Sequence, residues 1–173
     1  MYYPSRIVCL TEETTETLYL LGEQQRIVGI SGFTVRPAKA RKEKLKVSAF
    51  TSAKIDKILA LEPDLVLGFS NLQADIAADL IREGVAVHVF NQRSVEGVLQ
   101  MITLLGAMVG VPDKANALVA QYQQKIETIQ GAAKNFVQTK LRQDRVGTPF
   151  LPCETISFLR LNPATFCNLA LRH

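Results

Sequence analysis

The sequence has few of the residues on which most catalytic and metal sites depend. Tryptophan is absent, and His88 and His173 are the only two histidines in 173 residues. Histidine is a common general base and metal ligand, and neither histidine here has a cysteine, histidine or aspartate at ligand spacing. We therefore expect no catalytic residue, no metal site and no cofactor, and we expect that the protein is not an enzyme.

Long hydrophobic runs are also missing. No apolar run approaches the roughly 18 residues needed to cross a bilayer. The amino terminus, MYYPSR, leads directly into a strand-like segment, without the basic and apolar regions of a secretory signal. As written, the sequence predicts either a cytoplasmic protein or a mature or incomplete form of an exported one.

Cysteine is scarce and its spacing carries little information. Cys9, Cys153 and Cys167 make an odd number and include no CxxC pair. We expect buried or incidental thiols, and a disulfide between Cys153 and Cys167 is the alternative. The segment GISG at residues 29–32 is not a GxGxxG phosphate loop.

Excess positive charge is confined to the end of the chain. Residues 1–130 contain 14 Lys and Arg and 14 Asp and Glu, whereas residues 131–173 contain 6 and 2 and so supply the whole net charge of +4. A basic run at 36–46 is interrupted by Glu43 and has no interleaved aromatics, so it favours a solvated loop and helix face over a phosphate site. We expect no nucleic-acid partner, because the main body has no concentrated basic face.

The sequence does contain a regular alternation of strand and helix patterns. Apolar, β-branched runs predict strands at 6–10, 26–30, 46–49, 65–68 and 85–90. Helical periodicity predicts helices at 12–21, 52–60, 72–83, 95–109 and 112–130, with a loop over 31–46. This alternation is typical of an α/β fold: a single Rossmann-like lobe with a parallel sheet and a long C-terminal spine helix.

The chain divides accordingly into three parts. Residues 1–111 are expected to form an N-terminal α/β lobe, and residues 112–131 a long helix. Residues 132–173 form an atypical tail that neither continues the alternation nor reads as a polar linker. Our hypothesis is that this tail is a frameshift or truncation product, and the alternative is a genuine packed extension.

Phenylalanines recur where the predicted strands end. Phe33, Phe50, Phe69 and Phe90 each lie at or just past the carboxyl end of a strand, which in a parallel sheet places them on one edge. Ligands bind at that edge in open α/β sheets, and aromatic rings there suit a flat or hydrophobic ligand. The alternative is that these rings cover the core beneath loops.

Four segments together resemble the N-terminal lobe of a known family. They are RIVCLTEETTETLYLLG, RIVGISGF, KVSAFTSAKIDKILALEPDLVLGF and VHVFNQRSVEGVLQMITLLGAMVG. In this order they are similar to the class III periplasmic binding proteins of ABC importers for cobalamin and iron-siderophores. The resemblance covers about residues 6–130 and includes the Thr15-Glu16 pair, the LEPDLV segment at 61–66 and the long final helix.

The resemblance implies two α/β lobes joined by one long helix, with the ligand held between them. It implies that Phe33, Phe50 and Phe69 line the first lobe's side of this cleft. It gives no such role to Phe90, which we expect to lie in the core. It also implies that Asp56, in place of a frequent glutamate, pairs with arginines of a membrane ABC permease. The implied location is periplasmic or at the cell surface, although the sequence shows no signal peptide.

We therefore expect a substrate-binding component that captures cobalamin or a related corrinoid. Cobalamin is preferred because aromatics dominate the predicted edge, although Arg36 and Arg93 lie near it and anionic siderophores recruit arginine. An iron-siderophore or heme-binding protein of the same family is one alternative, and a dimerising interaction module is another. Nothing in residues 131–173 matches a second lobe, so we expect binding to be weak or absent in this chain.

Overall fold

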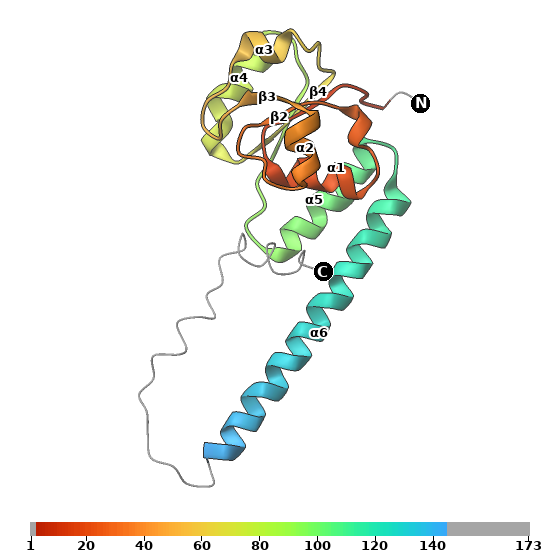
Figure 1. The fold of residues 1–173 in the computed structure, drawn as a ribbon, viewed down its shortest axis with the longest axis vertical. Coiled ribbons are helices and arrows are strands. Elements are labelled where there is room, and N and C mark those ends of the chain that lie inside the picture. Colours follow the sequence, from red (N-terminus) through yellow and green to blue (C-terminus); the bar gives the residue numbers. More distant parts are fainter. Residues whose placement is uncertain (1–2, 145–173) are drawn as a thin grey trace. The chain divides into compact units, whose positions relative to one another are not determined.

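The computed structural model describes residues 3–144, with side chains as far as residue 134 (Figure 1). The chain divides into two compact units, residues 1–116 and residues 117–173. The predictions about Cys153, Cys167 and the tail beyond Asp144 fall outside the described residues.

The first unit alternates strands and helices. The strands are β1 (Ile7–Cys9), β2 (Ile27–Ser31), β3 (Leu45–Ser48), β4 (Leu65–Phe69) and β5 (Val87–Phe90). The helices are α1 (Glu12–Leu20), α2 (Ala38–Glu43), α3 (Ile55–Leu59), α4 (Ala74–Arg82), α5 (Val95–Met108) and the start of α6 (Pro112–Asp144), with 3-10 turns η1 (Gln24–Arg26) and η2 (Asn71–Gln73).

The strands form one sheet in the order β3-β2-β1-β4-β5. Every neighbouring pair is parallel, so all five carboxyl ends lie along the same edge. The chain builds outward from β1 to β3 and then returns to add β4 on the other side of β1. The strand order therefore reverses between β1 and β4, which is the position where α/β sheets bind ligands. The predicted α/β lobe with a parallel sheet is confirmed.

Different helices cover the two faces of the sheet (Figure 1). Val8 of β1 and Val66 of β4 are fully buried in one cluster with Ile58 of α3 and Leu80 of α4. Side chains alternate along a strand, so Cys9 points to the opposite face, where it contacts the threonines of α1. The inner strands β1 and β4 are buried on both faces, which explains why they read as continuous apolar runs.

The predicted loop over residues 31–46 is wrong in part, because α2 forms within it. Ala40 is completely buried on this short helix, and Lys39 pairs with Glu43 one turn later at 3.4 Å. A single buried alanine among basic residues gives almost no apolar periodicity, so the pattern did not distinguish this helix from a loop.

α6 begins at Pro112, as predicted, and continues to Asp144, well beyond the predicted end near residue 130. Gly131 lies inside the helix with open space around its Cβ position. A glycine weakens an exposed helix by about 1 kcal/mol but does not by itself end it. At the first turn of α6, Gly106 of α5 allows a close approach, because an added Cβ would overlap the Cβ of Ala115.

Candidate ligand-binding site

The carboxyl edge of the sheet carries three phenylalanines. Phe33 follows β2, Phe50 follows β3 and Phe69 ends β4. Phe33 is 64% exposed, and the other two are half-buried. The structure thus places all three predicted site residues on one edge of the sheet, which we call the aromatic edge. None of the three rings is buried in the core, so each is at least partly accessible at this edge.

Polar contacts hold the loop that carries Phe33. The Phe33 N–H donates to Ser31 Oγ at 3.2 Å. Arg41 of α2 donates to the carbonyl oxygens of the residues on either side of Phe33, at 3.2 and 3.1 Å. The Gly32 N–H donates to the Ser48 carbonyl at the end of β3, at 2.7 Å. The exposed ring therefore extends from a backbone that is fixed on both sides.

One buried amide joins the loops that carry Phe50 and Phe69. Gln73 lies in η2 and is 1% exposed. Its Nε2 donates to the carbonyl oxygens of Phe50 at 2.8 Å and of Leu10 at 3.3 Å, and its Oε1 accepts from the Phe69 N–H at 2.9 Å. Leu10 directly follows β1, so this side chain connects the ends of three strands.

A cation lies against the aromatic edge. The guanidinium carbon of Arg93 is 5.4 Å from the centre of the Phe69 ring, and the Arg93 Nε donates to Asn91 Oδ1 at 3.2 Å. Arg93 forms no ion pair with any described carboxylate. Such a cation–π contact contributes about 0.5–1 kcal/mol when exposed, and it leaves a positive charge beside a flat apolar surface.

The backbone bends sharply at Ser70, directly after Phe69. Its φ of 59° and ψ of 176° lie in a region that residues with a Cβ rarely adopt. The buried Ser70 donates its N–H to the Phe90 carbonyl at 2.7 Å, and its Oγ accepts from the Leu72 N–H at 3.3 Å. These contacts hold the bend in place, and the bend returns Gln73 to the strand ends.

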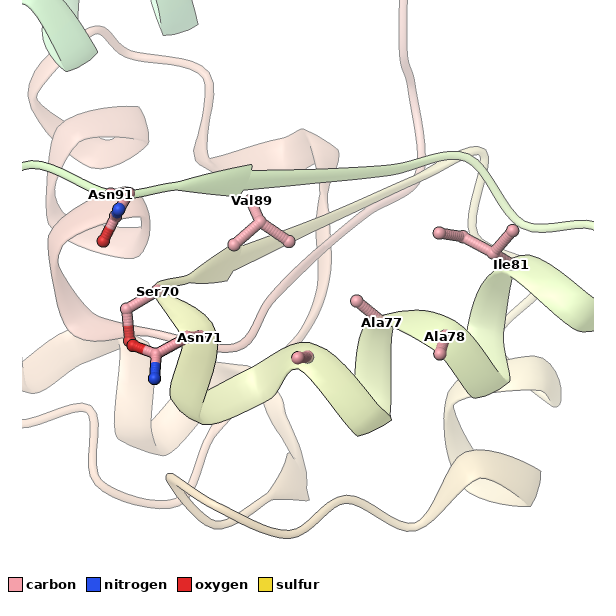
Figure 2. A pocket seen from close by; sticks show the side chains of 8 residues that line it. Ser70, Asn71, Ala77, Ala78, Ile81, Val89 and Asn91 are labelled. Atoms are coloured by element: carbon pink, nitrogen blue, oxygen red, sulfur yellow. The ribbon is translucent and has the colours of Figure 1, made fainter.

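A hollow of about 390 Å³ lies beside this edge, between α4 and β5 (Figure 2). Ser70, Asn71 and Asn91 form its polar end, close to where β4 and β5 finish. Val89 and Ile81, with alanines of α4, form its apolar part. The three phenylalanines of the aromatic edge do not line this hollow, so the two surfaces are neighbouring but separate.

Phe90 takes no part in the aromatic edge. It is 6% exposed, and its ring meets that of His88 edge to face, with centroids 4.4 Å apart and planes at 67°. The assignment of Phe90 to the core is confirmed. His88 is half-buried in a strand and contacts the Phe90 ring. This packing is a structural role for the histidine.

Asp56 lies on another surface, exposed in the first turn of α3. Lys54 and Lys57 flank it in the sequence, and with Lys46 they line a second hollow of about 300 Å³. Asp56 makes no ion pair within the part of the chain that the structure describes. Its carboxylate is therefore accessible to a partner, in surroundings where positive charge predominates.

Arg36 is engaged by α1 and does not face the aromatic edge as a free cation. Its Nε lies 3.2 Å from a carboxylate oxygen of Glu12, and its Nη2 lies 3.4 Å from one of Glu16. Burial raises the pKa of Glu16, and the positive charge of Arg36 opposes that shift. These two ion pairs attach the loop after β2 to α1.

The LEPDLV segment has a structural role at the opposite edge of the sheet. The carboxylate of Asp64 accepts from the N–H groups of Ser5 at 2.6 Å and Arg6 at 3.0 Å, and from the Ser5 hydroxyl at 2.9 Å. Burial disfavours the Asp64 carboxylate, but these hydrogen bonds outweigh it and lower its pKa. Asp64 thus attaches the start of β1 beside the start of β4.

The residues that hold the aromatic edge in place were not predicted from the sequence. Gln73 lies within the predicted helix at 72–83, and Arg41 belongs to a run interpreted as a solvated face. Ser70 gives no sign in the sequence that its φ is positive. The one signal is Gly68, because a Cβ there would lie 3.1 Å from the Gln73 Oε1, but a glycine in a strand can equally mark a bulge or a tight bend.

The described residues contain no group of three or more His, Cys, Asp and Glu that is placed to hold a metal ion. No described helix is both long and apolar enough to span a bilayer. Burial raises the pKa of Cys9 to about 12, against the lowering effect of hydrogen bonds from α1. A thiol in this state is inert as a nucleophile near neutral pH.

Known proteins share this fold and part of this sequence. The family described as periplasmic binding protein matches residues 7–141. An uncharacterised ABC transporter substrate-binding lipoprotein of Bacillus subtilis is 30% identical over 135 residues, which cover 76% of this chain and 42% of the relative. The cobalamin-binding protein of Halobacterium salinarum is 25% identical over 131 residues, which cover 75% of this chain and 36% of the relative.

A periplasmic heme-binding protein of Pseudomonas aeruginosa has a similar solved structure, with a TM-score of 0.69 and 25% identity. The match covers 76% of this chain and 49% of that protein. The chain thus spans about half, or less, of the length of the proteins that it matches.

Proposed function

The chain belongs to the periplasmic binding protein family, and from this premise we propose that it forms the first ligand-binding wall of a substrate-binding protein for an ABC importer. The proposed ligand is cobalamin or a related corrinoid, contacted by Phe33, Phe50 and Phe69. The observation that carries the proposal is the accessibility of these three rings at the ligand-binding edge of the sheet, while Phe90 is buried. Such rings provide a large contact area at low entropic cost.

The named relatives support a large, flat ligand. The Halobacterium salinarum protein is named for cobalamin and the Pseudomonas aeruginosa protein for heme. Both molecules are macrocycles whose faces suit aromatic rings. The lipoprotein and periplasmic relatives also support a location outside the cytoplasmic membrane for the proposed function.

Heme or a ferric siderophore is the second candidate ligand, and Arg93 is the observation that favours it. Its guanidinium lies over Phe69 and has no described carboxylate partner. A cation beside a flat apolar surface suits a conjugated ligand that carries acidic groups. The two candidates differ in charge, which allows them to be separated experimentally.

The test is a nuclear magnetic resonance titration of the chain with cyanocobalamin and, separately, with hemin. We expect the ring resonances of Phe33, Phe50 and Phe69 to shift, and those of Phe90 to stay in place. Phe33→Ala should weaken binding, whereas Val35→Ala should not, although both side chains are exposed on the same loop at 64% and 58%. Equal effects of the two substitutions, or no shift with either ligand, would contradict the proposal.

A surface role is proposed for Asp56. In an intact transporter complex this exposed carboxylate pairs with an arginine of the membrane permease. Asp56→Asn should weaken co-purification with that permease, most clearly at low salt, because exposed ion pairs are screened. Asp75→Asn, an exposed aspartate in the first turn of α4, is the control. Equal retention of the permease by both variants would exclude this role.

Self-association is an alternative use of the same edge, because Phe33 and Val35 expose apolar surface beside each other in the sequence. A dimer through this edge would bury both side chains without a ligand. Size-exclusion chromatography with light scattering decides between the two uses, since a monomer at high protein concentration excludes the dimer.

A further inference from the structure

We propose that Gln73 is the positioning residue of the aromatic edge, holding the backbones of Phe50 and Phe69 in their ligand-ready arrangement. The inference rests on the proposed function of that edge, and it assigns a role to a residue that makes no ligand contact itself. Gln73 is 1% exposed, so its amide acts entirely within the protein.

The contacts of Gln73 require a group that both donates and accepts. The carbonyl oxygens of Phe50 and Leu10 can only accept, and the Phe69 N–H can only donate. An amide satisfies all three at 2.8, 3.3 and 2.9 Å. This pattern also fixes the orientation of the amide. If its oxygen and nitrogen were exchanged, the amide oxygen would face two carbonyl oxygens and the amide NH₂ would face the Phe69 N–H.

The three partners come from segments that are far apart in the sequence. Leu10 follows β1, Phe50 follows β3 and Phe69 ends β4, and β3 lies two strands away from β1. The backbone hydrogen bonds that continue past the strand ends join neighbouring strands, such as the Leu10 N–H to the Leu67 carbonyl and the Ser70 N–H to the Phe90 carbonyl. Gln73 therefore supplies a connection across the carboxyl edge, at the reversal of strand order between β1 and β4.

The backbone at Ser70 and Gly68 favours the position of Gln73 at the strand ends. The strained bend at Ser70 turns η2 back toward the strand ends, and Ser70 is itself buried and hydrogen-bonded. Gly68, one strand position before Phe69, leaves room for the amide, because a Cβ there would lie 3.1 Å from Gln73 Oε1. Backbone strain persists where surrounding contacts enforce it, and it gathers at sites that need a fixed geometry.

The consequence is a pre-organised surface. A loop that is ordered only when a ligand arrives loses conformational freedom at that moment, and this loss weakens binding. With Gln73 in place, the loops that carry Phe50 and Phe69 are ordered beforehand. Phe33 depends on Arg41 and Ser31 instead, so its loop provides an internal reference.

The first test needs no ligand. The chain contains no tryptophan, so Phe50→Trp, Phe69→Trp and Phe33→Trp each introduce a single fluorescent reporter. Gln73→Met, which keeps the side-chain length but removes the amide, should increase the amplitude of fast motion at positions 50 and 69 about twofold or more in time-resolved anisotropy, and leave position 33 unchanged.

Val109→Ala is the control for general loss of stability, because Val109 is fully buried directly after α5 and its N–H bonds within that helix, to the Leu105 carbonyl. Gln73→Glu is the second variant. When ionised at high pH, its carboxylate can still accept from the Phe69 N–H but cannot donate, so position 50 should then become mobile while position 69 stays ordered. Unchanged motion in both Gln73 variants, or the same increase in Val109→Ala, would overturn the proposal.

A separate titration with cyanocobalamin connects this order to binding. If the unchanged chain binds, Gln73→Met should weaken the affinity at least fivefold, and Val109→Ala should not. Equal affinity would overturn the positioning role. If the unchanged chain does not bind, the corrinoid function fails, and the ligand-free anisotropy measurement still decides whether Gln73 orders the edge.

Discussion

At the scale of single residues, Arg93 separates the two candidate ligands. Hemin carries two propionates, whereas cyanocobalamin has no net charge. Arg93→Met should weaken hemin binding about fivefold, which corresponds to roughly 1 kcal/mol for an exposed charge pair, and should leave cyanocobalamin binding unchanged. Absorbance titrations measure both affinities.

Arg82→Met is the control for that experiment, because Arg82 is exposed on α4 and pairs with Asp79 at 2.6 Å. Removing the Arg82 charge should leave the affinities for hemin and for cyanocobalamin unchanged. An equal loss of hemin affinity in both variants would mean that the effect comes from net charge and not from the position of Arg93 over Phe69.

Asp64 gives a prediction for the pH dependence of stability. Its pKa is lowered from 3.8 in the folded chain, because hydrogen bonds from Ser5 and Arg6 outweigh the opposing effect of burial. A lowered carboxyl pKa stabilises the fold above the ordinary value of 3.8, and this contribution is lost as the pH falls through the folded value.

Asp64→Asn should therefore lower the free energy of unfolding by about 1 kcal/mol near neutral pH, and the difference should shrink below about pH 4. Urea unfolding across this range measures it. Glu83→Gln, at an exposed site after α4, should show no such convergence. A difference that stays constant with pH would contradict the assigned role of Asp64.

At the scale of elements, Gly106 determines how closely α5 meets the first turn of α6. An added Cβ would overlap that of Ala115, which is completely buried. Gly106→Ala should lower the free energy of unfolding by about 1–3 kcal/mol, because overpacking outweighs the better helix propensity of alanine. Gly131→Ala is the same substitution in open space within α6 and should stabilise that helix by up to about 1 kcal/mol. Urea unfolding compares the two, and equal midpoints would contradict the close approach.

Elements with strong apolar runs could be predicted from the sequence, because burial on both faces of a parallel sheet leaves a direct trace in composition. β1 and β4 are examples. The positions of Phe69 and Phe90 follow from where β4 and β5 end. α2 and the end of α6 could not be predicted, because exposed helices have weak periodicity. Gln73 could not be predicted either, since its burial depends on Leu10 and Phe50, which are 63 and 23 residues away in the sequence.

At the scale of the whole molecule, the described residues present the aromatic edge as an open surface, in a chain that spans about half or less of its matched relatives. Phe33 is mostly exposed, and the match covers 36% of the Halobacterium salinarum relative and 49% of the Pseudomonas aeruginosa protein. Among the described residues, the aromatic edge offers a ligand one wall. An open surface of this kind provides part of the contact area that an enclosed site provides.

The expected affinity follows from that geometry. If a second lobe supplies about half of the buried ligand area, a chain without it loses several kcal/mol, and each 1.4 kcal/mol is about tenfold in affinity. We therefore expect calorimetry to show that this chain binds cyanocobalamin only weakly, with a dissociation constant above about 1 μM. Phe33→Ala should weaken this binding further, because Phe33 is the most exposed of the three rings and its contact area is lost. Submicromolar binding by this chain alone would mean that the aromatic edge is a complete site, and that the half-site interpretation is wrong.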